Sequence, residues 1–291
     1  MKIFLYTRKV DMDHIEYINQ WVEFLVRRGC QLFVQENFLS VNLSFSPWKE
    51  YFQVVSENNQ IEDVDLAVGI GGDGTLLELS RFIGNYRIPI IGVNTGRLGF
   101  LSVVQLHQAK EIFERILNQE FEIENRSFIS VSQTEESEVI FPNALNEVVI
   151  VGYPHNTMIA VHAYVNDRFL ATYWADGLML ATPTGSTAYS LSCGGPIVSP
   201  DTNSFIITPI APHNLNVRPL IIPMSQRVTF IPESREGKFM MNIDGQGHLI
   251  HSGTRIVMER AQNDLRLVKL KGSDFFDTIR NKMGWGFDQR N

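Results

Sequence analysis

The first part of the chain alternates compact apolar runs with segments of helical periodicity. Residues 2–6 form a short apolar run, which predicts a buried strand. In residues 13–28 apolar side chains recur every three or four positions, the spacing of an amphipathic helix, and Gly29 follows as a stop. The alternation continues with predicted strands at 31–34, 65–70 and 88–93 and predicted helices at 76–83 and 107–119. Such short strand–helix units predict a mostly parallel sheet covered by helices.

Beyond Phe121 the pattern changes to short extended segments with few helical stretches. Residues 158–165 alternate, and the turn at 166–168 leads into a second extended segment at 169–174. Further extended segments are predicted at 122–131, 146–151, 204–210, 227–231, 238–243 and 254–260. This half of the chain therefore predicts a sandwich of antiparallel sheets. Residues 274–282 have the pattern of a final helix.

These patterns divide the chain into predicted domains. Residues 1–122 are expected to form an α/β domain that is Rossmann-like, with a mostly parallel sheet. Residues 123–270 are expected to form an all-β, sandwich-like domain. Residues 271–291 carry a C-terminal helix that we expect to return to the first domain. A length of 291 residues suits two domains of ordinary size.

Composition and charge narrow the class of protein. Hydrophobic residues make up 44% and charged residues 20%, an ordinary soluble composition. The formal net charge of −7 argues against a protein that binds nucleic acid or membrane surfaces, which needs a basic face. Cys30 and Cys193 lie far apart and offer neither metal-ligand spacing nor a disulfide framework. Because no apolar run suits a signal peptide or a spanning helix, we expect a cytoplasmic protein.

Residues 71–75, with the sequence GGDGT, are the first candidate for chemistry. They follow a predicted buried strand and precede a predicted helix. Glycines allow a ligand to approach the backbone, and successive N–H groups at such a turn bind anions. The carboxylate of Asp73 could act as a general base toward a hydroxyl or help to hold a magnesium ion. The simpler interpretation is a tight turn in which Asp73 caps the helix. The chain lacks a Walker A lysine pattern and the full GxGxxG fingerprint here, which disfavours P-loop enzymes and hydride-transferring Rossmann domains.

Three further stretches carry unusual combinations of residues. Residues 94–101 place two glycines around an arginine, which suits a loop near phosphates. Asn146 and Glu147 put an amide beside a carboxylate, a pair that could hold a purine edge and a vicinal diol but means little alone. Residues 182–187, with the sequence TPTGST, form a turn rich in hydroxyls, and Tyr189 could stack on a flat ring.

Together these stretches resemble one enzyme family. GGDGT is similar to the signature shared by NAD kinases, diacylglycerol and sphingosine kinases and, more distantly, 6-phosphofructokinases. Residues 94–101 resemble the NxGxLGFL segment of NAD kinases, Asn146-Glu147 their NE motif, and residues 176–196 their DG…TPTGSTAYS…GGP block. Residues 211–220 and 244–246 resemble the APHxLxxRPL segment and the DGQ turn. The resemblance is to NAD kinases of the bacterial type.

The resemblance implies an enzyme that transfers the γ-phosphate of ATP to the 2′-hydroxyl of the adenosine ribose of NAD, giving NADP. It implies Mg²⁺ or another divalent cation as cofactor, no dedicated protein metal site, and Asp73 as the catalytic base. NAD and ATP are the implied partners, and the β-rich domain is expected at the interface of a homotetramer or homodimer. The implied nucleotide contacts are Gly72, Gly74, Thr75, Leu77, Phe100, Asn146, Glu147, Asp176, Thr187, Ala188, Tyr189, Ser192, Ala211 and Gln246.

Other functions remain open at this point. A lipid kinase would share GGDGT but has no reason to carry Asn146-Glu147 or the TPTGST turn. A sugar-phosphate kinase would need an arginine cluster that the sequence does not show. A non-enzymatic NAD-sensing module would not need an intact Asp73. Inorganic polyphosphate as donor and NADH as acceptor are further open alternatives.

Overall fold

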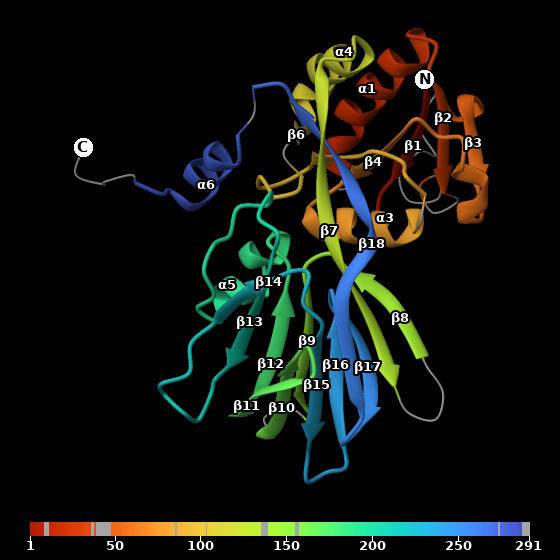
Figure 1. The fold of residues 1–291 in the computed structure, drawn as a ribbon. Coiled ribbons are helices and arrows are strands. Elements are labelled where there is room, and N and C mark those ends of the chain that lie inside the picture. Colours follow the sequence, from red (N-terminus) through yellow and green to blue (C-terminus); the bar gives the residue numbers. More distant parts are fainter. Residues whose placement is uncertain are drawn as a thin grey trace. The chain divides into compact units, whose positions relative to one another are not determined.

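The protein is described by a computed structural model that covers residues 1–8, 12–35, 38, 48–84, 86–102, 104–134, 139–154, 157–272 and 274–286. The chain folds into two compact units, one of residues 1–125 and 265–291 and the other of residues 126–264 (Figure 1). It leaves the first unit within the long strand β7 (Phe121–Thr134) and returns within β18 (Arg255–Leu270). Both boundaries therefore lie inside extended chain and not in loops.

The first unit is built on a parallel sheet. Strand β1 (Lys2–Tyr6) lies between β2 (Gln31–Gln35) and β4 (Leu66–Ile70), and β3 (Phe52–Val55) and β5 (Ile90–Asn94) follow on either side. The short β6 (Val104–Gln105) and the end of β18 also pair with β5, and every one of these pairs is parallel. The predicted α/β, mostly parallel sheet is thus confirmed.

Helices cover both faces of this sheet. Ile3 and Leu5 of β1 share one apolar cluster with α1 (Ile15–Arg27) and α4 (Ala109–Leu117). Within that cluster Trp21 and Phe113 meet edge to face, with ring centroids 4.8 Å apart. Phe4 points to the opposite face, because side chains alternate along a strand, and stacks on Phe82 of α3 (Asp73–Ile83). A further helix among the described residues is α6 (Phe275–Met283). Short 3₁₀ turns are η1 (Met12–His14), η2 (Lys49–Tyr51), η3 (Asn58–Ile61) and η4 (Leu106–Gln108).

The second unit contains antiparallel sheets around a separate core. One sheet has the order β14 (Leu220–Pro223), β13 (Ser204–Ile210), β12 (Gly177–Ala181), β9 (Glu147–Gly152), β16 (Lys238–Ile243) and β17 (Gln246–His251). In the other, β11 (Arg168–Ala175), β10 (Ile159–Val165), β15 (Val228–Glu233) and β18 are neighbours, and β7 pairs with both β18 and β8 (Val139–Ala144). The buried rings of Phe205, Phe230 and Phe239 belong to one cluster between them. The predicted antiparallel, sandwich-like half is confirmed.

Several boundaries differ from the sequence prediction. Helix α3 begins at Asp73, three residues before the predicted start, because the GGDGT turn itself forms the first helical turn. The predicted helix at 107–119 is divided into η4 and α4. Strands β3 and β14 were not predicted, because four residues are too few to show an alternating pattern. In the described part of the chain, no helix combines the length and apolarity needed to cross a membrane.

Candidate active site

The glycine turn is shaped by close packing against its own helix. All five residues of β4 are buried, and the chain turns at Gly71, which has a φ of +146°. A Cβ at Gly71 would lie 2.3 Å from Oγ1 of Thr75, so no larger residue fits there without movement. Gly72 is the N-cap of α3 and Asp73 its first residue. The simple interpretation of Asp73 as a capping residue is therefore wrong, and its side chain is free for another task.

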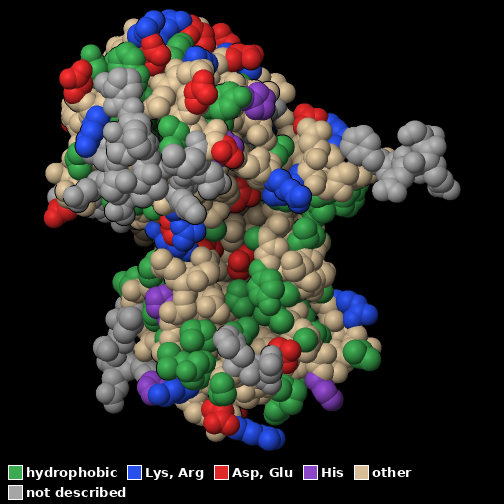
Figure 2. Space-filling view, turned by 180° about the vertical axis from the view of Figure 1, so that it is seen from behind, with side chains coloured by type: hydrophobic (Ala, Val, Ile, Leu, Met, Phe, Trp, Pro, Cys, Tyr) green, Lys and Arg blue, Asp and Glu red, His purple; other side chains and the backbone are tan. Residues whose placement is uncertain are grey.

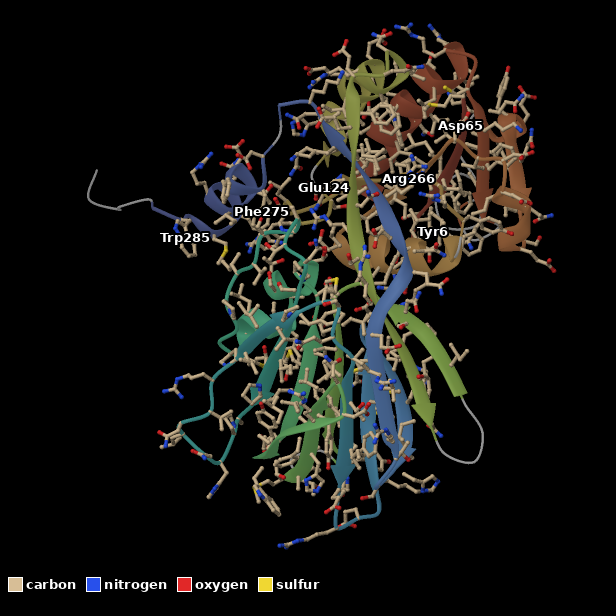
Figure 3. All side chains as sticks on the ribbon, in the orientation of Figure 1. Tyr6, Asp65, Glu124, Arg266, Phe275 and Trp285 are labelled. Atoms are coloured by element: carbon tan, nitrogen blue, oxygen red, sulfur yellow. The ribbon has the colours of Figure 1, made fainter. Side chains whose placement is uncertain are left out.

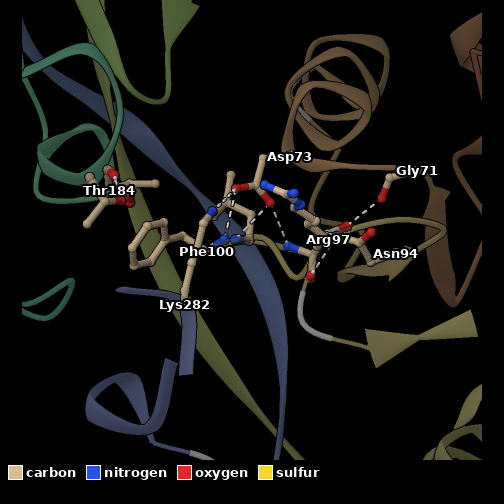
Figure 4. Close-up of polar contacts among 10 residues, drawn as sticks. Gly71, Asp73, Asn94, Arg97, Phe100, Thr184 and Lys282 are labelled. Atoms are coloured by element: carbon tan, nitrogen blue, oxygen red, sulfur yellow. Dashed lines mark hydrogen bonds and ion pairs between the residues drawn. The ribbon is translucent and has the colours of Figure 1, made fainter. Parts of the chain in front are cut away.

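The carboxylate of Asp73 binds three consecutive backbone amides of a second loop (Figure 4). Its Oδ2 accepts a hydrogen bond from the N–H of Phe100 at 2.8 Å. Its Oδ1 accepts two, from Leu101 at 3.1 Å and from Ser102 at 2.9 Å. Because each carboxylate oxygen has two acceptor positions, Oδ1 is filled and Oδ2 keeps one position. The ammonium of Lys282 lies 3.7 Å from Oδ2, beyond hydrogen-bond distance.

The loop that Asp73 holds is also fixed to β5 and to the glycine turn. Asn94, the last residue of β5, accepts from the N–H of Gly96 at 2.6 Å and donates to the carbonyl of Arg97 at 2.7 Å. The hydroxyl of Ser102 donates to the carbonyl of Gly71 at 2.9 Å. Side chains from both loops, at the carboxyl ends of β4 and β5, therefore join the two loops to each other. Open α/β sheets bind ligands at this edge.

A polar group at the end of β1 was not predicted from the sequence. The hydroxyl of Tyr6, labelled in Figure 3, donates to Glu78 of α3 at 3.1 Å. Burial, with Glu78 beside it, raises the pKa of Tyr6 to about 12. Arg8 forms an ion pair with the same carboxylate at 2.5 Å. In the sequence, Tyr6 belongs to an apolar run that predicts only a strand, so the pattern gave no sign of a polar role for this residue.

The second unit contains a pocket with a volume of about 520 Å³. Three predicted contact residues, Glu147, Asp176 and Tyr189, line it. The rest of its lining was not predicted and consists of Val149, Val151, Gly152, Ile210, Asn242 and Gly245. Apolar walls with a few converging polar groups are typical of small-molecule sites.

A second carboxylate, that of Asp244, fixes the segment that brings Glu147 to this pocket. Asp244 accepts hydrogen bonds from the N–H groups of Leu145 at 2.7 Å, Asn146 at 2.8 Å and Glu147 at 3.0 Å. Asp244 itself has a φ of +44°, in the tight turn between β16 and β17. The motif DGQ contained the signal for this residue, but only Gln246 was predicted as a contact. Asp244 fixes the Asn146–Glu147 pair, as Asp73 fixes the 100–102 loop.

The TPTGST turn packs directly on the same segment. A Cβ at Gly185 would lie 2.1 Å from the carbonyl oxygen of Asn146, so glycine is needed for this approach. The hydroxyl of Thr182 donates to the carbonyl of Leu145 at 2.5 Å, and the N–H of Gly185 donates to the same hydroxyl at 3.1 Å. The turn forms η5 (Thr184–Thr187) and leads into α5 (Tyr189–Ser192), which starts at Tyr189 on the pocket wall.

The remaining predicted contact residues do not line the pocket. Thr187 donates its hydroxyl hydrogen to the carbonyl of Thr184 at 3.2 Å, and the N–H of Ala188 donates to Gly185 at 2.9 Å. Ser192 ends α5, Ala211 directly follows β13 and Gln246 opens β17. In the first unit, Gly72, Gly74, Thr75 and Leu77 belong to the glycine turn and α3, and Phe100 belongs to the loop bound by Asp73.

Glu147 is electrostatically unusual. Its side chain is buried, and its Oε2 has no hydrogen-bond partner among the described residues. Burial, followed by the nearby charge of Asp244, raises its pKa from 4.5 to about 8, although a hydrogen bond with the backbone of Tyr189 opposes the shift. The pKa of Tyr189 is also raised, chiefly by burial. A carboxyl group with such a displaced pKa on a pocket wall is typical of a functional site.

The first unit is a parallel α/β unit with a carboxylate at its glycine turn, and the second is a β-sandwich with a pocket lined in part by polar side chains. Together these features define a kinase of the GGDGT type. The chain matches the model of the ATP-NAD kinase N-terminal domain over residues 3–121 and that of the ATP-NAD kinase C-terminal domain over residues 145–270. It therefore belongs to the NAD kinase family.

Full-length relatives and solved structures agree with this assignment. The chain is 37% identical to the NAD kinase of Cytophaga hutchinsonii over 99% of both chains, and 44% identical to that of Bacteroides fragilis over 80% of both. An NAD kinase from Archaeoglobus fulgidus, solved in complex with ATP, is 25% identical, with a TM-score of 0.75, and the match covers 98% of this chain and 99% of that one. The fold also matches a yeast NADH kinase complexed with NADH at 24% identity, with a TM-score of 0.88 over 99% of this chain and 88% of that one.

The close approach of Gly99 to Asp73 gives a first test. A Cβ at Gly99 would lie 1.9 Å from Oδ1 of Asp73, so Gly99→Ala must displace the carboxylate or the loop. Because small misplacements of reacting groups are costly, we expect turnover to fall by about 100-fold. Gly96→Ala is the matched control, since its Cβ would meet nothing closer than 3.8 Å. NADP formation by both variants at saturating ATP and NAD is the measurement, and equal turnover would contradict the role of this contact.

The displaced pKa of Glu147 gives a second test, on stability. Because the pKa is about 8 in the folded protein and 4.5 ordinarily, the native state binds more protons between these values. The free energy of unfolding attributable to Glu147 therefore falls as pH rises from about 4.5 to 8. We expect Glu147→Gln to gain stability relative to wild type across this window, by up to about 1.4 kcal/mol per pH unit.

Urea denaturation of the ligand-free protein at a series of pH values measures this effect. The exposed residue Glu236 provides the control, and Glu236→Gln should run parallel to wild type at every pH. Parallel curves for Glu147→Gln as well would show that the carboxyl of Glu147 ionises normally in the folded protein.

Proposed function

We propose that the chain transfers the γ-phosphate of ATP to the 2′-hydroxyl of the adenosine ribose of NAD, with the donor on the first unit and the acceptor on the second. In terms of the predicted domains, residues 1–122 would bind the phosphates and residues 123–270 the NAD. The observation that carries the proposal is the carboxylate of Asp73, held at the glycine turn with one acceptor position of Oδ2 open.

The donor phosphates have two sources of positive potential in the first unit. The N–H groups of the glycine turn and the N-terminus of α3 favour an anion at the start of this helix. Mg²⁺ or another divalent cation would reach the site with ATP, because magnesium is usually held by substrate phosphates and one or two carboxylates. No group of three potential ligand side chains gathers among the described residues, so in this mechanism the phosphates of ATP would hold the cation and Oδ2 of Asp73 would stay available for the proton.

The acceptor fits the pocket of the second unit. Glu147 and Asn146 would hold the adenosine, with the ring of Tyr189 beside the base and Asp176 on the nicotinamide side. In the reaction the 2′-oxygen attacks the γ-phosphorus and its proton passes to Oδ2 of Asp73. The bond from the γ-phosphorus to the β–γ bridging oxygen breaks, and its electron pair leaves with ADP. Most of the rate enhancement comes from positioning and charge neutralisation.

Removal of the base tests this mechanism. We expect Asp73→Asn to lower turnover by at least about 100-fold while the Kd for NAD changes little, because the pocket belongs to the other unit. NADP is measured with a strictly NADP-specific dehydrogenase, and NAD binding by calorimetry. The control is Asp277→Asn, because the side chain of Asp277 is half exposed on α6 and pairs there with Arg280. Normal turnover by Asp73→Asn would exclude the base, and NAD binding without turnover by wild type would favour a sensing module.

The same assay separates the remaining alternatives. Polyphosphate replacing ATP, or NADH replacing NAD, would give product with the wild-type protein under the corresponding conditions. Phosphorylation of a diacylglycerol in vesicles, with no NADP formed, would favour a lipid kinase. Both cysteines are free in the structure, as expected for a reducing compartment, and we propose that the reaction takes place in the cytoplasm.

Self-association is a further part of the proposal. Strand β11 is the edge of its sheet, and it exposes Phe169 at 60% and Trp174 at 55%. Ile221 on the edge strand β14 of the other sheet is also exposed. Figure 2 likewise shows apolar side chains gathered on the surface of the β-rich unit. Exposed apolar edges of this kind mark interaction surfaces, which supports a homodimer or homotetramer formed through the second unit.

Charged substitutions on β11 test this interface. We expect Phe169→Asp combined with Trp174→Asp to lower the mass in solution, because a buried unpaired charge opposes association. Tyr17→Asp is the control, because Tyr17 is a large exposed side chain of the first unit. Sedimentation velocity at several protein concentrations measures the mass. A wild-type monomer, or an unchanged oligomer in the double variant, would contradict the proposed interface.

A further inference from the structure

The C-terminal helix brings a lysine to the catalytic carboxylate. Lys282 lies near the end of α6, and its ammonium is 3.7 Å from Oδ2 of Asp73 and 4.2 Å from the ring centroid of Phe100 (Figure 4). α6 belongs to the same unit as both residues, and none of its side chains is buried. Among the described residues, α6 has no other ion pair or ring contact with the rest of the unit.

Stability does not explain this arrangement. The side chains of Lys282 and Asp73 are each about one-third exposed, and an ion pair screened by water in this way contributes little to stability. A cation over an aromatic ring at an exposed site also contributes little. The helix itself is closed by its own residues, since Asp274 caps its start and Gly284 ends it in a left-handed conformation. Lys282 is therefore not needed to form α6.

The position of Lys282 suits a ligand that carries negative charge. Its ammonium has three N–H donors, and none makes a hydrogen bond to another described residue. Arg8 lies close to Gly74 but is committed to Glu78 at 2.5 Å, and Arg97 is an exposed residue of the loop that Asp73 binds. A triphosphate at the glycine turn would put several negative charges beside the carboxylate of Asp73. The divalent cation that comes with ATP offsets part of the resulting repulsion, and an ammonium within reach of Oδ2 offsets more of it.

We propose that Lys282 is a catalytic residue that binds the γ-phosphate of ATP during transfer. Its flexible stem lets the ammonium move from its contact with Oδ2 to a γ-phosphate oxygen, which leaves Oδ2 free to take the proton of the 2′-hydroxyl. As the bond to the bridging oxygen of ADP breaks, the ammonium offsets the charge on the transferred phosphoryl group. The inference rests on the proposed function, because it concerns the donor of that reaction.

The test compares variants of the whole 291-residue chain. Lys282→Met removes the charge but keeps an unbranched apolar stem for the ring of Phe100, and Lys282→Arg restores a cation with different geometry. Arg280→Met removes one positive charge from the same helix, where Arg280 is exposed and, among the described residues, pairs with Asp277 of its own helix. Turnover, the KM for ATP and the Kd for NAD are measured for each, and thermal melting confirms folding.

We expect Lys282→Met to lower kcat by about 100-fold, as for other single donors to a developing charge, with an unchanged Kd for NAD. Lys282→Arg should recover part of the loss, and Arg280→Met should equal wild type. Added small primary amines should partly restore Lys282→Ala. If polyphosphate also serves as donor, the loss should be the same, because both donors present a terminal phosphoryl group.

Three results would overturn the proposal. Wild-type turnover in Lys282→Met would show that no phosphate contact is made. Faster turnover in Lys282→Met would instead show that the contact of Lys282 with Asp73 inhibits the enzyme. An equal loss in Arg280→Met, together with a lower melting temperature, would show that α6 acts only through its packing. Failure of the proposed function is distinguishable, because wild-type protein would then form no NADP with any donor.

Discussion

Two carboxylates, one in each unit, each accept hydrogen bonds from three consecutive backbone amides and so fix the loops that carry the candidate site residues. Asp73 accepts hydrogen bonds from the N–H groups of residues 100–102, and Asp244 accepts them from those of residues 145–147. Backbone amides in a tight loop have no partners within the loop, and leaving them unpaired away from water is costly. One ionised side chain satisfies three of them with charge-assisted bonds. Each loop is thereby held rigid without regular secondary structure.

This constraint explains why glycines surround the functional residues. A carboxylate can reach three successive amides only if the chain beside it has no Cβ in the way. Gly99 faces Oδ1 of Asp73 for this reason, and Gly185 leaves room for the carbonyl of Asn146. At Gly71 the positive φ adds a conformational requirement to the steric one. The glycines of the motifs therefore allow close packing around these loops, and Gly99 in particular leaves room for the carboxylate of Asp73.

The sequence predicted the fold and the loops better than the contacts between them. The apolar run 65–70 followed by GGDGT located the turn correctly, because a buried parallel strand leaves a clear local pattern. The partners of Asp73 could not be read in the same way, since amide donors come from any residue and leave no side-chain signature. Asp244 was visible in its motif, but its role depends on β16 and β9 being neighbours. The contact of Lys282 with Asp73 depends on a helix far away in the sequence, where one lysine on a polar surface is ordinary.

The acidic groups of the two units are prepared for opposite tasks. Asp73 receives three N–H donors and lies 3.7 Å from an ammonium, and these contacts fix the direction of its open lone pair. Glu147 is buried near another carboxylate, and its pKa of about 8 keeps it mostly protonated at neutral pH. A neutral carboxyl group can both donate and accept a hydrogen bond. It can therefore bind the hydroxyls of a ribose, as an ionised carboxylate can. It also avoids an unpaired buried charge on the pocket wall. The first unit thus carries a carboxylate fixed by backbone amides, and the second carries a buried carboxyl group on a pocket wall.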